Sequence, residues 1–157
     1  MTNSRLELRP AQAILLGGLT VGVIDCAFAT IRSAQHGTSF VTLWQGVASG
    51  ALGDKAAQGG VATAALGLLI HFFIATSIVA FYVWLSRRMP FLLHPWWLWG
   101  PIYGLGVYIF MNFVVIPLSA IGPQPHVLSR MWWGIGIHLV GIGLPAAFFA
   151  SRVNEER

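Results

Sequence analysis

Four ionisable or amide side chains lie inside long apolar stretches of this sequence. They are Asp25, His71, Asn112 and His138, with Tyr108 one helical turn before Asn112. A carboxylate beside imidazoles can hold or relay a proton. Two histidines and one carboxylate also resemble a non-haem metal site, and two facing histidines could be the axial ligands of a b-type haem. No motif spacing supports either metal interpretation.

The stretches that carry these residues have the length of membrane-spanning helices. The chain is 56% hydrophobic and 9% charged, whereas soluble domains average about 25% charged residues. A helix needs about 20 mostly apolar residues to cross a bilayer. We therefore predict an all-α polytopic membrane protein, a four-transmembrane-helix bundle forming a single domain over residues 1–157. The predicted spans are about 11–31, 60–85, 96–121 and 131–150.

A shorter helical pattern between the first two spans covers residues 40–53. It is too short to cross a bilayer, so we expect an interfacial amphipathic helix with Trp44 as its anchor. A re-entrant hairpin is the alternative, although its backbone would need protein cover. In the first span, Ala27-Phe28-Ala29 resembles a signal-peptide cleavage site. The acidic Asp25 just before it argues against cleavage.

The polar residues lie at similar depths along their helices. At a rise of ~1.5 Å per residue, Asp25 lies ~10 Å and His138 ~12 Å below the outer end of its helix. Asn112 and His71 follow at ~13 Å and ~15 Å. Each shares a stripe with small residues such as Gly22, and small residues let membrane helices approach closely. We therefore expect the four side chains to face a common centre.

This polar layer has three interpretations. It is a hydrogen-bonded lock that fixes helix register, a site that handles a proton or small solute, or a metal or haem site with ligands from His71, His138 and Asp25. Exposing Asp25 to lipid would cost about 2.5–3.5 kcal/mol, so it needs a partner inside the bundle. An imidazole is the natural partner.

Basic residues predict the orientation of the helices, because Lys and Arg favour the cytoplasmic side. An inward N-terminus and C-terminus give a two-to-one excess inside. The inner residues are Arg5, Arg9, Arg87, Arg88, Arg152 and Arg157; the outer ones are Arg32, Lys55 and Arg130. All seven tryptophans fall at predicted span boundaries, where aromatic belts form.

Composition excludes several other functions. The net charge of +4 comes from residues at the ends of apolar runs and not from a basic stripe with interleaved aromatics. We therefore exclude nucleic acid as a partner. A single cysteine, Cys26, cannot form an internal disulfide or a CxxC redox pair.

Two segments of the sequence carry a family resemblance. They are Gly59-Gly60-x-x-Thr63-Ala64-x-x-Gly67-x-x-x-His71-Phe72 and Tyr103-Gly104-x-x-x-Tyr108-x-x-Met111-Asn112-Phe113, followed by Pro117-Leu118-Ser119. With them, the chain resembles small uncharacterised bacterial inner-membrane proteins, the YagU-like group among them. The resemblance spans the four predicted helices. It implies a bacterial plasma-membrane location and a connection to stress or acid resistance, and it brings no catalytic residues.

The leading functional expectation is a non-enzymatic inner-membrane protein with a buried Asp-His-Asn network, acting as a membrane or complex component without a cofactor. A proton-coupled small-solute transporter acting as a homo-oligomer is the first alternative, since four helices enclose little pathway. A b-type haem protein in electron transfer is the second. The expected partners are the lipid bilayer and further copies of the chain or a larger membrane complex.

Overall fold

The chain folds into helices throughout the region that the structure describes. The computed structural model describes residues 7–125 and 128–153. Arg5 and Arg157, counted in the orientation argument, lie outside this region, as does the side chain of Arg130. Within it, β pairing is limited to an isolated bridge between Leu8 and Val153.

Four helices are long and apolar enough to cross a membrane. They confirm the four predicted apolar helices to within a few residues, as Pro10–Gln35, Gly60–Arg88, Trp96–Leu118 and Met131–Ala150. The elements in order are α1 Pro10–Gln35, α2 Phe40–Leu52, the 3-10 turn η1 Gly53–Gln58, α3 Gly60–Arg88, the 3-10 turn η2 Pro90–Leu93, α4 Trp96–Phe110, the π-helical η3 Met111–Val115, α5 Ile116–Leu118, α6 Leu128–Ile137, the π-helical η4 His138–Gly143 and α7 Leu144–Ala150.

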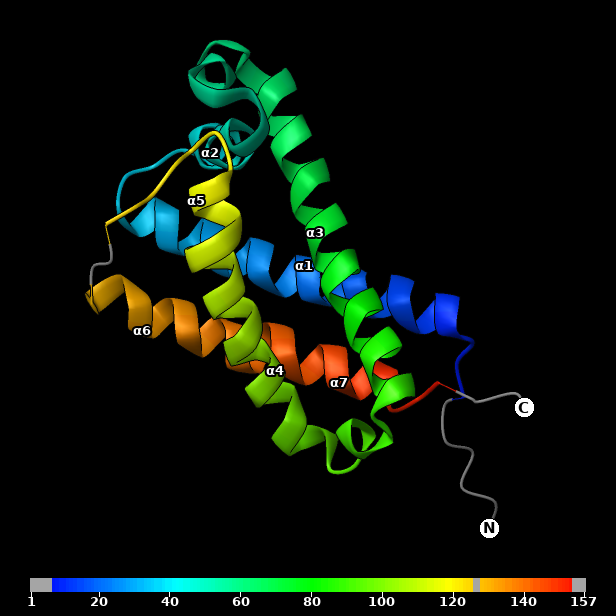
Figure 1. Ribbon diagram of the computed structural model, residues 1–157. Coiled ribbons are helices and arrows are strands. Elements are labelled where there is room, and N and C mark those ends of the chain that lie inside the picture. The colour runs from blue at the N-terminus through cyan, green and yellow to red at the C-terminus, as the bar shows by residue number, and fades with distance from the viewer. Residues whose placement is uncertain (1–6, 126–127, 154–157) are drawn as a thin grey trace.

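The long helices form two crossed layers. Figure 1 shows α1 running opposite to the continuous α6–η4–α7 helix, with α3 and α4 lying across this pair. α1 packs against α3 and α7, and α4 packs against η4 and α7. Small buried side chains such as Ala75, Ala146 and Ala147 fill the crossing, together with Val21 and Val79.

Glycines bring the helix backbones into direct contact. A Cβ on Gly67 of α3 would overlap the carbonyl oxygen of Trp44 in α2, and one on Gly104 of α4 would overlap that of His138. On α1, a Cβ on Gly22 would lie 2.5 Å from the ring of Phe72. Close approach of this kind gains dispersion energy between helices that gain little from hydrophobic association in lipid.

The prediction that Trp44 anchors α2 at a lipid interface is wrong. Its side chain is 1% exposed and packs against α3, which α2 contacts along its length. The contact exists because Gly67 leaves room for the α2 backbone. Gln45 ties the two helices further by donating from Nε2 to the carbonyl oxygen of Gly60 at 3.0 Å. Trp44 is therefore a core residue.

Two prolines explain the π-helical segments. Pro117 is the second residue after η3, and Pro145 is the second residue after η4. Proline has no N–H to donate, and its ring clashes with the carbonyl four residues earlier. A wider π turn relieves that clash while the helix continues. The widened turns begin at Met111 and His138, so they fall beside the predicted polar layer.

A pair of alanine substitutions in α4 tests the glycine packing. Gly104→Ala should lower the free energy of unfolding by about 1–3 kcal/mol, because the new methyl overlaps the His138 carbonyl. Gly106→Ala is the matched control, since a Cβ there meets open space, and helix propensity favours alanine by up to about 1 kcal/mol. Thermal unfolding in detergent measures both. Equal shifts in the two variants would contradict the proposed packing.

Candidate functional site

Asp25, His71 and His138 line a single cavity of about 150 Å³. They come from α1, α3 and η4, which the crossing of the helices brings together. The remaining wall is apolar and consists of Val21, Val47, Ile74, Ala75, Ile78, Met111 and Ile142. A water molecule occupies about 30 Å³ in the liquid, so the space suits a few waters or one small group.

His71 is held in one orientation. Its Nε2 lies 2.9 Å from the carbonyl oxygen of Gly22 in α1. A carbonyl oxygen can only accept, so Nε2 carries a proton and donates it. The imidazole is also flanked edge-to-face by the rings of Trp44 and Phe72, at centroid distances of 5.0 and 5.2 Å. Three contacts therefore fix the direction in which Nδ1 points.

Nδ1 of His71 faces the carboxylate of Asp25. The distance from Nδ1 to Asp25 Oδ2 is 3.8 Å, which is within ion-pair range and too long for a hydrogen bond. The side chains of His71 and Asp25 are 12% and 25% exposed. A bare carboxylate in an apolar bundle is costly. With a proton on Nε2 alone, His71 is neutral and the Asp25–His71 pair carries one negative charge. One more proton makes the pair neutral, either on Nδ1, which gives an imidazolium, or on Oδ2, which gives a carboxylic acid.

His138 is tied within its own helix. Its Nδ1 lies 2.8 Å from the carbonyl oxygen of Gly134, so Nδ1 carries the proton and Nε2 is the acceptor of the neutral ring. The buried ring of Tyr108 in α4 packs edge-to-face on it at 5.3 Å. Both histidines thus use one nitrogen to bond a main-chain carbonyl and have the other left for further chemistry.

Asn112 does not join these three residues. Its side-chain amide donates from Nδ2 to the carbonyl oxygen of Tyr108 at 2.9 Å, within its own helix. It is not part of the cavity wall, to which η3 contributes Met111. The bond to the Tyr108 carbonyl turns the amide back along its own helix, at the start of the π-helical segment.

The residues do not fit a haem or a three-ligand metal site in this conformation. The cavity is smaller than the roughly 300–1,000 Å³ of pockets that hold drug-sized ligands, and a porphyrin needs more room still. Within residues 7–125 and 128–153, no three His, Cys, Asp or Glu side chains are grouped so as to hold a metal ion. The chemistry open to the site is that of a carboxylate and two imidazoles.

Trp44 belongs to the site and was missed by sequence reasoning. It packs against His71 and is almost fully buried, while its Nε1 has no hydrogen-bond partner in the described part of the chain. Leaving a buried donor unpaired costs about 1–3 kcal/mol, which the packing of α2 on α3 must exceed. The spacing of Trp44 and Ala48 with Gly67 was the available signal, since a small residue invites a close neighbour.

Comparisons with protein-family profiles, curated proteins and solved structures find no match to this chain.

The assigned protonation can be checked by nitrogen NMR of the histidine side chains. In ¹⁵N-labelled protein, His71 should be protonated at Nε2 and His138 at Nδ1, because each bonds a carbonyl oxygen. His94 is exposed and serves as the control, with averaging between its two tautomers. A bare Nε2 on His71 would contradict the assigned geometry.

Proposed function

We propose that this chain is a four-span membrane protein that binds one exchangeable proton between Asp25 and His71, inside the bilayer. The observation that carries the proposal is the 3.8 Å approach of His71 Nδ1 to Asp25 Oδ2 in an otherwise apolar cavity. Because the Nε2–H of His71 donates to the Gly22 carbonyl oxygen, Nδ1 is the ring nitrogen of His71 that can gain or lose a proton. His138, in the same cavity wall, is a second acceptor to which that proton can pass.

A bilayer location has two supports. Four helices are long and apolar enough to cross a membrane. Large apolar side chains also point outward from the long helices, where a soluble protein would place polar ones. Among the exposed side chains are Leu15, Leu16, Val61, Leu69, Phe73, Leu118 and Val140.

We further propose that both termini face the cytoplasm of a bacterium. The excess of Lys and Arg at one set of helix ends supports the orientation. The Leu8 N–H donates to the carbonyl oxygen of Arg152 at 2.8 Å, so the start of α1 and the end of α7 lie on the same side. The resemblance to YagU-like proteins supports the bacterial plasma membrane. The lipid bilayer is the partner, α2 lies toward the outer surface, and several copies of the chain would complete any transport pathway.

A purely structural lock has one observation in its favour. The bond from His71 Nε2 to the Gly22 carbonyl joins α3 to α1 whatever the charge of the site. A lock, however, would be most effective if the polar side chains bonded one another. Here the described bonds of both imidazoles go to backbone carbonyls, and Asn112 bonds within its own helix.

Infrared difference spectra between acidic and basic pH test the proton site. Wild-type protein should show one buried carboxyl or imidazolium change per chain, and Asp25→Asn should remove it because the shared proton has lost one partner. His71→Gln retains an amide donor for the Gly22 carbonyl and should shift the band without unfolding the protein. Asp54→Asn is the control, because Asp54 is an exposed carboxylate.

Two results would decide against the proposal. One is an Asp25→Asn spectrum that matches the wild type. The other is an Asp25→Asn variant that loses thermal stability while the pH-dependent bands persist, which is the result expected of a structural lock.

A further inference from the structure

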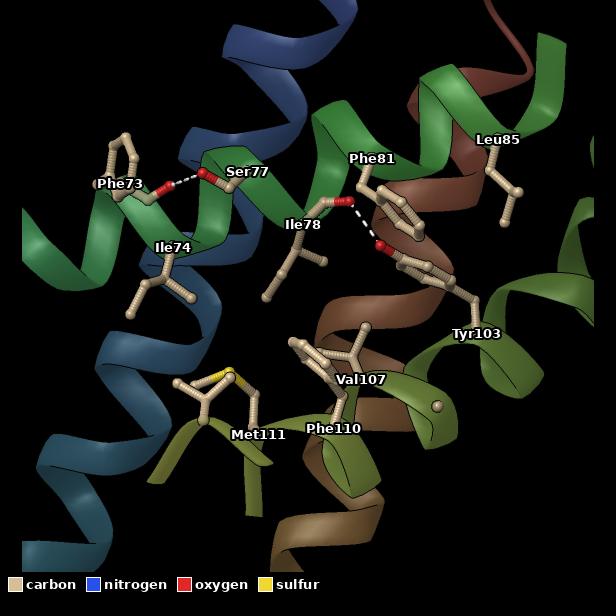
Figure 2. A pocket seen from close by; sticks show the side chains of 12 residues that line it. Phe73, Ile74, Ser77, Ile78, Phe81, Leu85, Tyr103, Val107, Phe110 and Met111 are labelled. Atoms are coloured by element: carbon tan, nitrogen blue, oxygen red, sulfur yellow. Dashed lines mark hydrogen bonds between the residues drawn. The ribbon is translucent and has the colours of Figure 1, made fainter. Parts of the chain in front are cut away.

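An apolar groove of about 600 Å³ opens between α3 and the α4–η3 helix. Figure 2 shows side chains from both helices lining it, with the rings of Phe73, Phe81 and Phe110 among them. Tyr103 crosses from α4 and donates from its hydroxyl to the carbonyl oxygen of Ile78 at 2.7 Å. The Tyr103 hydroxyl therefore already has a hydrogen-bond partner. The wall of the groove consists almost entirely of aliphatic and aromatic side chains.

The groove adjoins the proton site. Ile74, Ile78 and Met111 line both the groove and the cavity that contains Asp25. These three side chains therefore form the partition between the apolar groove and the partly exposed carboxylate of Asp25. Methionine is unbranched and adapts its shape readily, so Met111 is the most adaptable side chain of this partition.

The charge of the Asp25–His71 pair limits which molecules can occupy the groove and the cavity beside it. The titratable groups that line the cavity with Asp25 are His71 from α3 and His138 from η4, whereas α2 and η3 contribute only Val47 and Met111. Tyr108 of α4 packs behind His138, and Cys26 follows Asp25 in α1. Without its shared proton the Asp25–His71 pair carries a net negative charge. An anionic molecule would be repelled there, and a neutral one would leave the charge uncompensated.

We propose that the groove binds a lipid-soluble organic cation whose charge replaces the proton shared by Asp25 and His71. This inference rests on the proposed proton site. Aromatic rings attract cations over their faces, which adds to the pull of the carboxylate. The groove volume lies within the roughly 300–1,000 Å³ typical of small-molecule pockets. The ligand is therefore a slim aromatic or alkyl cation with its charge at one end.

Binding and release balance in charge. One cation enters and one proton leaves Oδ2 or Nδ1 for solvent. The pair then carries one negative charge, which the bound cation compensates, so the site as a whole stays neutral. Affinity should therefore rise with pH by up to about tenfold per unit, as expected when one proton is released on binding.

The test uses 1-methyl-4-phenylpyridinium, a permanent cation that forms no micelles, and 4-methylbiphenyl as its neutral carbon analogue. Full-length protein in a non-ionic detergent should bind the cation by calorimetry, more tightly at about pH 8 than at about pH 6. Close to one proton per bound cation should appear in weakly buffered solution. The neutral analogue should bind without proton release or pH dependence.

Three variants locate the site. Asp25→Asn should abolish proton release and the pH dependence. Gly106→Leu should weaken binding at least tenfold, because Gly106 lines the groove and has open space at its Cβ, so the new side chain fills the groove without a clash. Gly136→Leu is the matched control, since it also has open space at its Cβ and lies on α6 outside the groove.

The outcomes separate this inference from the proton site itself. Absent cation binding with an intact infrared proton signal overturns the groove proposal and leaves the proton site standing. Cation binding that Asp25→Asn or Gly106→Leu does not change also overturns it, because the cation then sits elsewhere or in detergent. Loss of both signals would reject the two proposals together.

Discussion

Direct backbone contact at glycines is the constraint on which the site depends. Phe72 fits against Gly22 only because that position has no side chain, and the fit brings His71 within reach of the Gly22 carbonyl. Gly67 leaves room for the α2 backbone at Trp44, and the ring of Trp44 then packs against His71. Larger residues at these positions would force the helices apart by more than a hydrogen bond can span. The position of His71 thus depends on Gly22 and Gly67, which have no side chain to keep the helices apart.

The same close packing explains why the site can hold charge at all. Asp25 lies in a wall of aliphatic side chains, where a lone carboxylate is strongly disfavoured. His71 is held in place, because its Nε2 bonds the Gly22 carbonyl and its ring packs edge-to-face with Trp44 and Phe72. One proton, or one cation that takes its place, then restores neutrality. The proposed route of such a cation is the apolar groove next to Ile74, Ile78 and Met111.

Sequence patterns predicted the four long helices and the polar residues of the cavity, Asp25, His71 and His138. The apolar runs gave the four long helices, because length and composition alone determine them. Equal depth, together with the small-residue stripes, brought Asp25, His71 and His138 together. The burial of Trp44 was missed, since an aromatic residue at a span boundary is more often an interface anchor. Asn112 bonds the Tyr108 carbonyl within its own helix and does not line the cavity. It lies in the π-helical residues 111–115, and regular α-helical spacing does not predict such a segment. The groove depends on which helices are neighbours, and no periodicity encodes that.

A double-mutant cycle between Asp25 and His71 tests the central claim most directly. Free energies of unfolding at neutral pH would be measured for the wild type, Asp25→Asn, His71→Gln and the double variant. Two side chains that share one proton should be strongly non-additive, with a coupling free energy above about 1 kcal/mol. Additivity within about 0.3–0.5 kcal/mol, the level found for independent sites, would contradict the claim.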